Sequence, residues 1–203
     1  MSGQARERSQ TPAGRTLSLR VLSILLRYPD EDLCNAQEEI AAVAAQLQPR
    51  EVQSAVRMFS EALRRQPLIR NQEKYTAVFD MDPAATMNMT YHIHGDNEKR
   101  AQALARLEHT YGQAGWQRAT GELPDYLPLM LEFLAVCEHP AHAGVVWECL
   151  QGLGAMVAHL EKKAPTYAAL LRPVIRMADA WRGSKANVPG PAENNLDPQE
   201  TRP

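Results

Sequence analysis

The sequence predicts an all-α fold, a single-domain helical bundle, and three observations support this prediction. The 203 residues are 44% hydrophobic and 23% charged, an ordinary globular composition with enough chain for one domain and a substantial core. Between residues 16 and 182, Ala, Leu, Glu, Gln and Arg dominate and apolar residues recur at helical spacing, without alternating β-branched runs. Residues 1–15 and 183–203 are polar, so we expect a disordered segment on either side of the helical domain.

Apolar repeats bounded by proline, glycine or acidic residues divide most of the domain into predicted helices. They cover residues 17–28, 32–47, 50–66, 68–79, 84–91, 97–111, 140–163 and 165–181. Between the fifth and sixth of these, Gly95 suits a left-handed helix cap and Asp96 suits the N-cap of the next helix. His94 would then lie near a helix end, where the carbonyl dipoles favour it.

A proline-braced loop leads into an unusually apolar helix within residues 121–134. Pro124 and Pro128 cannot both lie inside one regular helix, because Pro128 would remove a donor and crowd the carbonyl of Pro124. We therefore expect the helix to begin between them, with Asp125 as its N-cap and Pro128 in the first turn, where no donor is required. The residues beyond, including Phe133, leave hardly any polar face, which is typical of a helix in a core.

Glu132 is the one acidic residue on this apolar helix. A carboxylate in such a place must reach a wet edge, find a donor or take up a proton. Glu132 is therefore either a satisfied structural residue or a group that faces a partner in a groove. Asp125 has the same two interpretations, because N-capping alone would account for it.

Composition and motifs argue against several functional classes. The formal net charge of −2 and the pI of about 6.3 provide no basic face, so we expect no nucleic-acid partner. The apolar run 17–26 is far shorter than the ~20 residues that cross a bilayer, so we expect no direct membrane insertion. Neither a phosphate loop nor a nucleophile motif is present, so we expect no nucleophilic catalysis. Three widely spaced cysteines favour the cytoplasm over an oxidising compartment: Cys34, Cys137 and Cys149.

Two histidine clusters provide an alternative interpretation. His92, His94 and Asp96 could serve a helical metal-binding enzyme. His139 and His142 have a proline between them at a helix start, so they lack the i, i+4 geometry of a helical zinc pair. We expect structural or solvent-facing roles for both clusters and no bound metal, with the metal-binding enzyme as the alternative.

Four blocks of the sequence carry a resemblance to a known family. They are residues 22–29, 75–80, 89–96 with the following Lys99 and Arg100, and 121–133. In order and spacing they resemble the TorD-like redox enzyme maturation proteins, which are assembly chaperones of molybdenum enzymes, and among these the NarJ type that matures respiratory nitrate reductase. Leu123 before the proline and Tyr126 in place of a histidine point to the NarJ branch and away from TorD-type nucleotide binding.

This resemblance implies an all-helical chaperone of the TorD/NarJ-like type that is not an enzyme. Such a chaperone binds the apo catalytic (alpha) subunit of respiratory nitrate reductase, chiefly its N-terminal segment. It supports insertion of the molybdenum cofactor into that subunit before membrane docking, without keeping a cofactor bound itself. The alternative partner is another molybdenum oxidoreductase of the same superfamily.

The resemblance also implies a groove between helices that receives the peptide. A helical peptide can lay its apolar face in such a groove, with carboxylates and tyrosines setting its orientation. The matched blocks supply the candidates for partner binding, which are Tyr75, Phe79, Tyr91, Asp125, Tyr126 and Glu132. The candidates for a structural role in the same blocks are His94, Gly95, Asp96, Pro124, Pro128 and Phe133.

Overall fold

The computed structural model describes residues 12–119 and 121–186, and within these ranges the chain is helical and contains no β-strand. The α-helices are α1 (Pro12–Leu25), α2 (Glu31–Asn35), α3 (Gln37–Ala44), α4 (Arg50–Arg64), α5 (Leu68–Tyr75), α6 (Met89–His94), α7 (Glu98–Gln113), α8 (Leu127–Val136), α9 (Pro140–Cys149), α10 (Leu153–Lys163) and α11 (Pro165–Ala186). Three short turns of other helix types are η1 (Thr76–Asp80), η2 (Pro83–Ala85) and η3 (Leu150–Gly152). The predicted all-α fold is confirmed.

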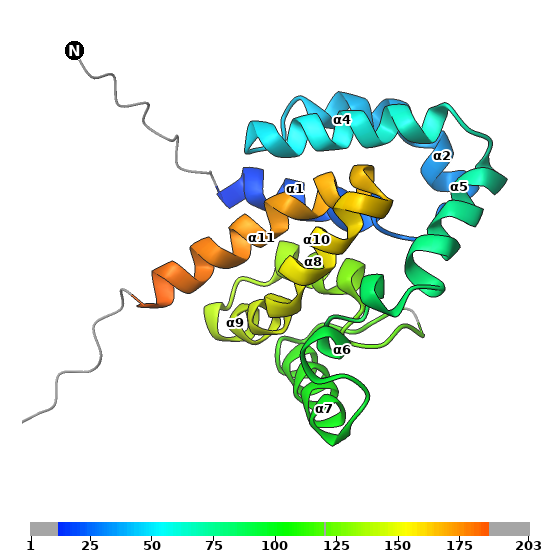
Figure 1. The fold of residues 1–203 in the computed structure, drawn as a ribbon. Helices are drawn as coiled ribbons and strands as arrows, with labels where there is room; N and C mark the ends of the chain where they lie inside the picture. Colours follow the sequence, from blue (N-terminus) through cyan, green and yellow to red (C-terminus); the bar gives the residue numbers. More distant parts are fainter. Residues whose placement is uncertain (1–11, 120, 187–203) are drawn as a thin grey trace, which may run out of the picture.

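Helix α8 runs through the middle of the molecule, and α1 packs along it (Figure 1). Eight of the ten residues of α8 are buried, as expected for a helix with almost no polar face. On α1, Leu22 and Leu25 are fully buried. The buried Ser23 hydroxyl donates a hydrogen bond of 2.7 Å to the Pro128 carbonyl oxygen, so its burial leaves no unpaired polar group.

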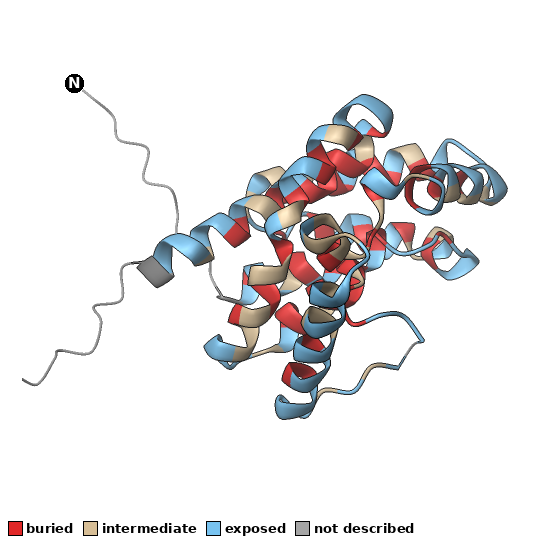
Figure 2. Cartoon of the chain, turned by 60° about the horizontal axis from the view of Figure 1, so that its bottom comes forward, coloured by how far each residue is buried: buried red, intermediate tan, exposed pale blue. Residues whose placement is uncertain are grey.

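The other helices cover this central pair. Helix α11 packs against both α4 and α10, while α4 crosses one end of the molecule and α6 and α7 lie toward the opposite end (Figure 1). Buried residues face inward on each of these helices and exposed residues face outward (Figure 2). The buried side chains form one apolar cluster that extends from α1 to α11. None of the described helices is long and apolar enough to cross a membrane.

The helical domain is longer at both ends than the sequence predicts. Helix α1 begins at Pro12 and α11 ends at Ala186, so residues 12–15 and 183–186 are helical and do not belong to the expected disordered segments. Proline is tolerated in the first turn of a helix, because its missing N–H needs no partner there. The rest of both expected segments lies outside the described residues.

Three of the predicted helices are interrupted. Residues 32–47 form α2 and α3, residues 84–91 include part of η2 and part of α6, and residues 140–163 form α9, η3 and α10. At η3, Gly152 packs against His92 of α6 so closely that an added Cβ would overlap the Cβ of His92. Glycine thus permits the approach of α6 and also weakens the helix at this point.

Helix α7 is capped by Asn97, and the prediction that Asp96 caps it is wrong. The Asn97 Oδ1 atom accepts hydrogen bonds from the backbone N–H groups of Lys99 and Arg100, at 2.9 and 3.3 Å. Asp96 lies one residue too early and instead pairs with Arg100 Nη1 at 3.5 Å. Gly95 follows α6 with a φ of 65° and a ψ of −155°, a conformation open essentially to glycine alone but different from the predicted left-handed cap. Aspartate and asparagine are equally good N-caps, so the sequence did not distinguish these neighbours.

The Asp82 carboxylate ties η2 to α10. It lies 2.7 Å from His159 Nε2 and 2.5 Å from Lys163 Nζ, and it also accepts a hydrogen bond of 3.1 Å from the Ala84 N–H. The hydrogen bonds from Lys163 and His159 hold the pKa of Asp82 well below its ordinary value. Residues 81–88, which connect η1 to α6, are therefore anchored to the C-terminal half of the chain.

Gly152→Ala should destabilise the fold by roughly 1–3 kcal/mol, because the added Cβ overlaps His92 and only a shift of packed helices can relieve it. Gly154→Ala is the matched control: it lies in α10, and an added Cβ there meets nothing within 4 Å. Its better helix propensity should stabilise the fold by up to about 1 kcal/mol. Urea unfolding followed by circular dichroism measures both. Equal stability of the two variants would contradict the described packing of α6 on η3.

Asp82→Asn should lower the free energy of unfolding more at about pH 6 than at about pH 3.5. A carboxylate whose pKa is depressed in the folded state contributes stability above its unfolded pKa, and that contribution fades as the pH falls toward the folded pKa. Urea titrations at the two pH values measure the difference. Asp179→Asn, which removes an exposed pair with Arg182 on α11, should have a small effect at both pH values. A pH-independent effect of Asp82→Asn would count against the ion-pair cluster.

Candidate functional site

Two pockets share part of their lining, and we call them together the tyrosine groove. They have volumes of about 280 and about 260 Å³ and share Phe79, Asp80, Thr86 and Asn88. The first pocket is also lined by Tyr28, Tyr75, Met87, Glu122 and Tyr126. The second pocket is also lined by Pro83, Tyr91 and Arg100. The groove thus brings together four of the six side chains predicted to bind a partner, which are Tyr75, Phe79, Tyr91 and Tyr126.

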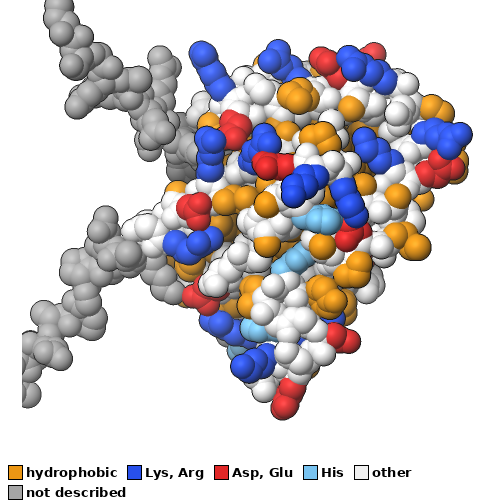
Figure 3. Space-filling model, viewed as in Figure 1, with side chains coloured by type: hydrophobic (Ala, Val, Ile, Leu, Met, Phe, Trp, Pro, Cys, Tyr) orange, Lys and Arg blue, Asp and Glu red, His pale blue; other side chains and the backbone are white. Residues whose placement is uncertain are grey.

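The surface of the molecule is mixed in character. On the face shown in Figure 3, acidic, basic and apolar side chains are interspersed, without a continuous basic field. Large apolar residues that stay exposed include Tyr28 in the groove and two direct sequence neighbours of its lining, Met81 and Leu123. Exposed apolar side chains beside a groove are typical of protein recognition surfaces.

Tyr75 forms the centre of the groove wall. Its ring contacts those of Tyr28 and Phe79, with centroids 5.4 and 4.7 Å apart, within the range favourable for aromatic pairs. Its hydroxyl donates to the Leu26 carbonyl oxygen at 3.2 Å and lies 3.2 Å from the Tyr126 hydroxyl. Burial raises the pKa of Tyr75 and of Tyr126, so both phenols are neutral at physiological pH.

Phe79 enters the wall from the π-helical turn that follows α5. Met81 N donates to the Thr76 carbonyl oxygen at 3.0 Å, the i→i+5 bond of a π-helix. The Phe79 ring also packs on Tyr167 of α11, with centroids 4.8 Å apart. Such turns frequently occur at functional sites, because they change which side chains share a helix face.

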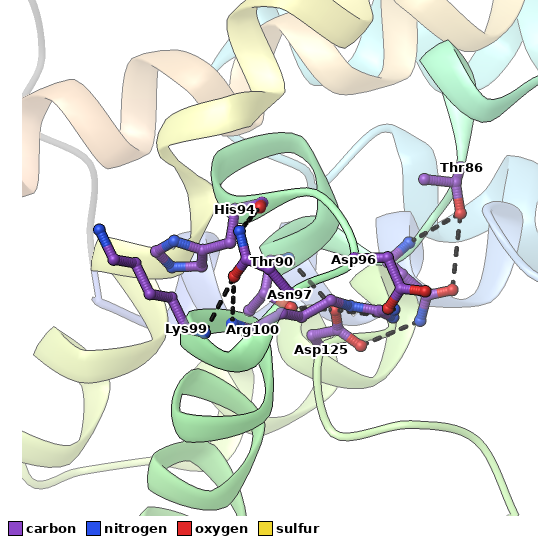
Figure 4. A network of polar contacts seen from close by, with 9 residues as sticks. Thr86, Thr90, His94, Asp96, Asn97, Lys99, Arg100 and Asp125 are labelled. Carbon is purple, nitrogen blue, oxygen red and sulfur yellow. Dashed lines mark hydrogen bonds and ion pairs between the residues drawn. The ribbon is translucent and has the colours of Figure 1, made fainter.

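Asp125 lies in the corner beside the groove and is completely buried. Its carboxylate accepts hydrogen bonds from Asn88 Nδ2 at 3.0 Å, from Thr90 N at 3.2 Å and from Thr90 Oγ1 at 2.5 Å (Figure 4). Arg100 Nη2 lies 3.9 Å away. The Thr90 N–H is one of the donors that the first turn of α6 leaves without a helical partner. Asp125 therefore caps α6, although it lies in the loop that precedes α8.

The prediction that Asp125 caps α8 is wrong. The N-cap of α8 is Tyr126, which makes no side-chain capping bond, and Pro128 lies in the first turn as expected. A carboxylate just before a helix can turn to another helix end when that end offers more donors, and here Asn88 and Thr90 supply them. Since Asp125 has no exposed surface, it cannot touch a ligand without rearrangement. Asp125 instead holds the loop before α8 against the start of α6.

Two backbone hydrogen bonds hold the Asp125 loop against the start of α6. Met89 N donates to the Asp125 carbonyl oxygen at 3.0 Å, and Leu127 N donates to the Met87 carbonyl oxygen at 2.8 Å. They form an isolated antiparallel bridge between Asn88 and Tyr126. The bridge fixes the Tyr126 side chain beside the groove residues of the η2–α6 connection.

Pro124 of the proline corner and Phe133 of α8 lie in the core. The Pro124 carbonyl oxygen accepts a hydrogen bond of 2.8 Å from the Tyr111 hydroxyl. Phe133 is buried, and its ring packs on Tyr111 and Trp116 with centroids 4.7 and 5.5 Å apart. The corner is thus held by α7 as well as by its own prolines.

Glu132 does not line either pocket of the tyrosine groove. Its Oε2 atom lies 2.7 Å from Arg27 Nη2, and both side chains are about half exposed. The Glu132 carboxylate is thus solvent-exposed and hydrogen-bonded to Arg27, so two of the three expected ways to accommodate a carboxylate on an apolar helix apply. A contact between Glu132 and a partner stays a prediction.

The histidines of the metal-binding alternative have other contacts. His92 Nε2 makes a hydrogen bond of 2.8 Å with the Thr86 carbonyl oxygen, and the rings of His139 and His142 stack with centroids 4.5 Å apart. Among the described residues, no three His, Cys, Asp or Glu side chains are grouped so that they could hold a metal ion.

The sequence did not single out Asn88, Thr90 and Arg100, which surround the Asp125 carboxylate. Thr90 and Arg100 belong to a matched block, and Asn88 directly precedes it. The matched block therefore pointed to this region of the sequence. The role of the three residues, however, depends on contact with Asp125, which lies 25 to 37 positions away.

Comparisons with known proteins identify similar sequences. The model of the protein family described as "Nitrate reductase delta subunit" matches residues 45–170. A Bacillus subtilis (strain 168) protein named as a probable nitrate reductase molybdenum cofactor assembly chaperone NarJ is 33% identical over 157 residues, which are 77% of this chain and 85% of the relative. The Escherichia coli (strain K12) nitrate reductase molybdenum cofactor assembly chaperone NarJ is 31% identical over 165 residues, 80% of this chain and 70% of the relative.

A solved structure from Archaeoglobus fulgidus, described as a redox enzyme maturation protein, has a similar fold. The TM-score is 0.55, and the match covers 91% of this chain and 99% of that chain at 18% sequence identity. At this identity the likeness concerns the fold alone. It agrees with the predicted all-helical architecture.

Asp125→Asn should destabilise the protein by roughly 2–4 kcal/mol, because one amide oxygen cannot replace a buried carboxylate that accepts three hydrogen bonds. Asp96→Asn is the matched control, since Asp96 pairs with the same arginine but its side chain is 88% exposed. That change should alter stability by less than about 0.5 kcal/mol. Urea unfolding of both variants measures the difference, and similar effects would mean that the Asp125 contacts are dispensable.

Proposed function

The chain belongs to the nitrate reductase delta subunit family, and on that premise we propose that it is an assembly chaperone of respiratory nitrate reductase. It acts as a chaperone and not as an enzyme. In this proposal it binds the apo alpha subunit in the cytoplasm, chiefly through the N-terminal segment of that subunit. It keeps the subunit competent for insertion of the molybdenum cofactor and delays membrane docking, and the cofactor goes to the subunit.

The observation that carries this proposal is the tyrosine groove. Residues from three distant parts of the chain meet there, and they include four candidates that the sequence predicts: Tyr75, Phe79, Tyr91 and Tyr126. Each pocket is smaller than the ~300–1,000 Å³ typical of sites that enclose a whole small molecule. Successive pockets of this size suit successive side chains of one peptide.

A helical peptide fits this arrangement physically. An amphipathic helix presents anchors at i, i+3, i+4 and i+7 to a hydrophobic groove, and aromatic residues are the commonest source of binding energy at such surfaces. Tyr91 and Tyr126 are only half-buried, so each retains ring surface that a ligand can cover. Arg100 lies over the Tyr91 ring, 5.7 Å from its centroid, and this cation–π contact restrains the ring.

The roles of the remaining candidates follow from their positions. Asp125 supports the groove from within, through its hydrogen bonds to Asn88 and Thr90. Glu132 and Arg27 form an exposed pair where α1 and α8 meet. In this proposal the pair lies outside the peptide-binding surface and is available to other parts of the partner.

Tyr91→Ala and Tyr126→Ala should each weaken binding of a peptide from the N-terminus of the nitrate reductase alpha subunit by about tenfold, because each removes an aromatic anchor of the groove. Isothermal titration calorimetry with the full chain measures the affinity. Circular dichroism of the same samples should show unchanged helicity.

Met58→Ala is the control for this experiment, since Met58 is an exposed apolar residue of α4 that lines neither pocket. Its affinity for the peptide should match that of the unaltered chain. If the tyrosine variants bound as tightly as Met58→Ala, the peptide site would lie elsewhere. If the unaltered chain bound no peptide, the proposed function would be contradicted.

A further inference from the structure

We propose that the tyrosine groove selects a segment that presents a lysine or arginine side chain, and that Asp80 and Glu122 receive this cation. The inference rests on the proposed function and specifies the chemistry of the segment that the groove binds. It follows from which hydrogen-bonding groups of the first pocket are already engaged and which are not.

Three side-chain donors along the wall of the first pocket, those of Tyr75, Tyr126 and Asn88, are engaged within the protein. The Leu26 carbonyl oxygen can only accept, so Tyr75 donates its one hydroxyl proton to it at 3.2 Å. Tyr126 must then donate its own proton to the Tyr75 oxygen, also across 3.2 Å. Asn88 Nδ2 donates to the Asp125 carboxylate at 3.0 Å. These three donors are therefore already occupied before a ligand binds.

The acceptors of the same pocket remain available. Asp80 and Glu122 are both exposed, and in the described part of the chain neither carboxylate has an ion pair or a side-chain hydrogen bond. Both line the first pocket together with Tyr126, and the charges of both raise the pKa of its hydroxyl. The Tyr126 oxygen keeps its lone pairs after donating its proton. Three acceptors therefore surround one pocket.

Cations near this pocket are neutralised elsewhere. Arg27, which also acts on the Tyr126 hydroxyl, pairs with Glu132 at 2.7 Å. Arg118 donates to the backbone carbonyl oxygen of Glu122, but its ion pair is with Glu108 at 2.7 Å. Arg100, which lines the second pocket together with Asp80, lies 3.5 Å from Asp96 and 3.9 Å from Asp125. In the described part of the chain, none of these three arginines forms an ion pair with Asp80 or Glu122.

When a peptide covers the groove, the charge of Asp80 and Glu122 affects which peptide binds. A bound segment removes water from the carboxylates, and an unpaired carboxylate loses solvation that an apolar side chain cannot replace. A lysine or arginine restores that loss with charge-assisted hydrogen bonds and gains cation–π contact with the aromatic wall. An acidic side chain would add repulsion. The groove therefore discriminates among amphipathic segments by the charge at one position.

Three synthetic peptides test this inference. They are amphipathic sequences of about 16 residues, long enough to form a helix, built from Leu, Phe, Ala and Gln and differing only at one central position. That position is Lys, the uncharged isostere norleucine, or Glu. By calorimetry with the full chain, the Lys peptide should bind about tenfold more tightly than the norleucine peptide, and the Glu peptide most weakly.

The double variant Asp80→Asn/Glu122→Gln should lose the preference for lysine, because its side chains keep their size and lose their charge. A matched control, Glu39→Gln/Glu138→Gln, removes two exposed charges that do not line the groove and should retain the preference. Equal affinity of the Lys and norleucine peptides for the unaltered chain would overturn the inference. So would an undiminished preference in Asp80→Asn/Glu122→Gln, or no binding by any of the three peptides.

A parallel titration with the alpha-subunit peptide separates this inference from the proposed function. If that peptide binds the unaltered chain and the Asp80→Asn/Glu122→Gln variant equally well, the inference is overturned and the proposed function stands. If the synthetic Lys peptide binds selectively and the alpha-subunit peptide does not bind, the proposed function fails while the charge selection by the groove stands.

Discussion

The buried carboxylate of Asp125 is the interaction on which the shape of the groove depends. It stands in the loop before the most buried helix, and its donors belong to the start of α6, 35 residues or more earlier in the chain. A carboxylate in the core is tolerated only when donors surround it. The requirement for those donors therefore sets where the loop and the helix end must meet, and the bridge between Asn88 and Tyr126 follows from their meeting.

This constraint gives the groove a rigid frame. One wall stands on η1, which is packed through Phe79 on α11, and another stands on the loop that leads into α8. Asp82 anchors the connection between η1 and α6 to α10. Because the wall residues are held before a ligand arrives, little side-chain order has to be created on binding, and more of the contact energy is kept as affinity.

The sequence predicts best those features that depend on neighbours along the chain. The apolar pattern predicted the helical fold and the central position of α8, and the spacing of Pro124 and Pro128 located the start of that helix correctly. Prediction from the sequence failed where a contact with a residue far along the chain determines the local structure. Asp125 has the local features of an N-cap, and only the position of Thr90 turns its carboxylate to α6. The break at η3 depends in the same way on a contact between Gly152 and His92. Glu132 meets an arginine 105 residues away, which no local pattern reveals.

The first pocket of the groove is lined by residues as far apart as Tyr28 and Tyr126, so it exists only in the folded chain. Any molecule that occupies it binds the native state and has no equivalent site on the unfolded one. At a free concentration of a hundred times its dissociation constant, such a molecule adds about 2.7 kcal/mol to the unfolding free energy of its host. If the proposed client segment occupies the groove, it stabilises the folded chaperone against unfolding and proteolysis while the chaperone protects the client.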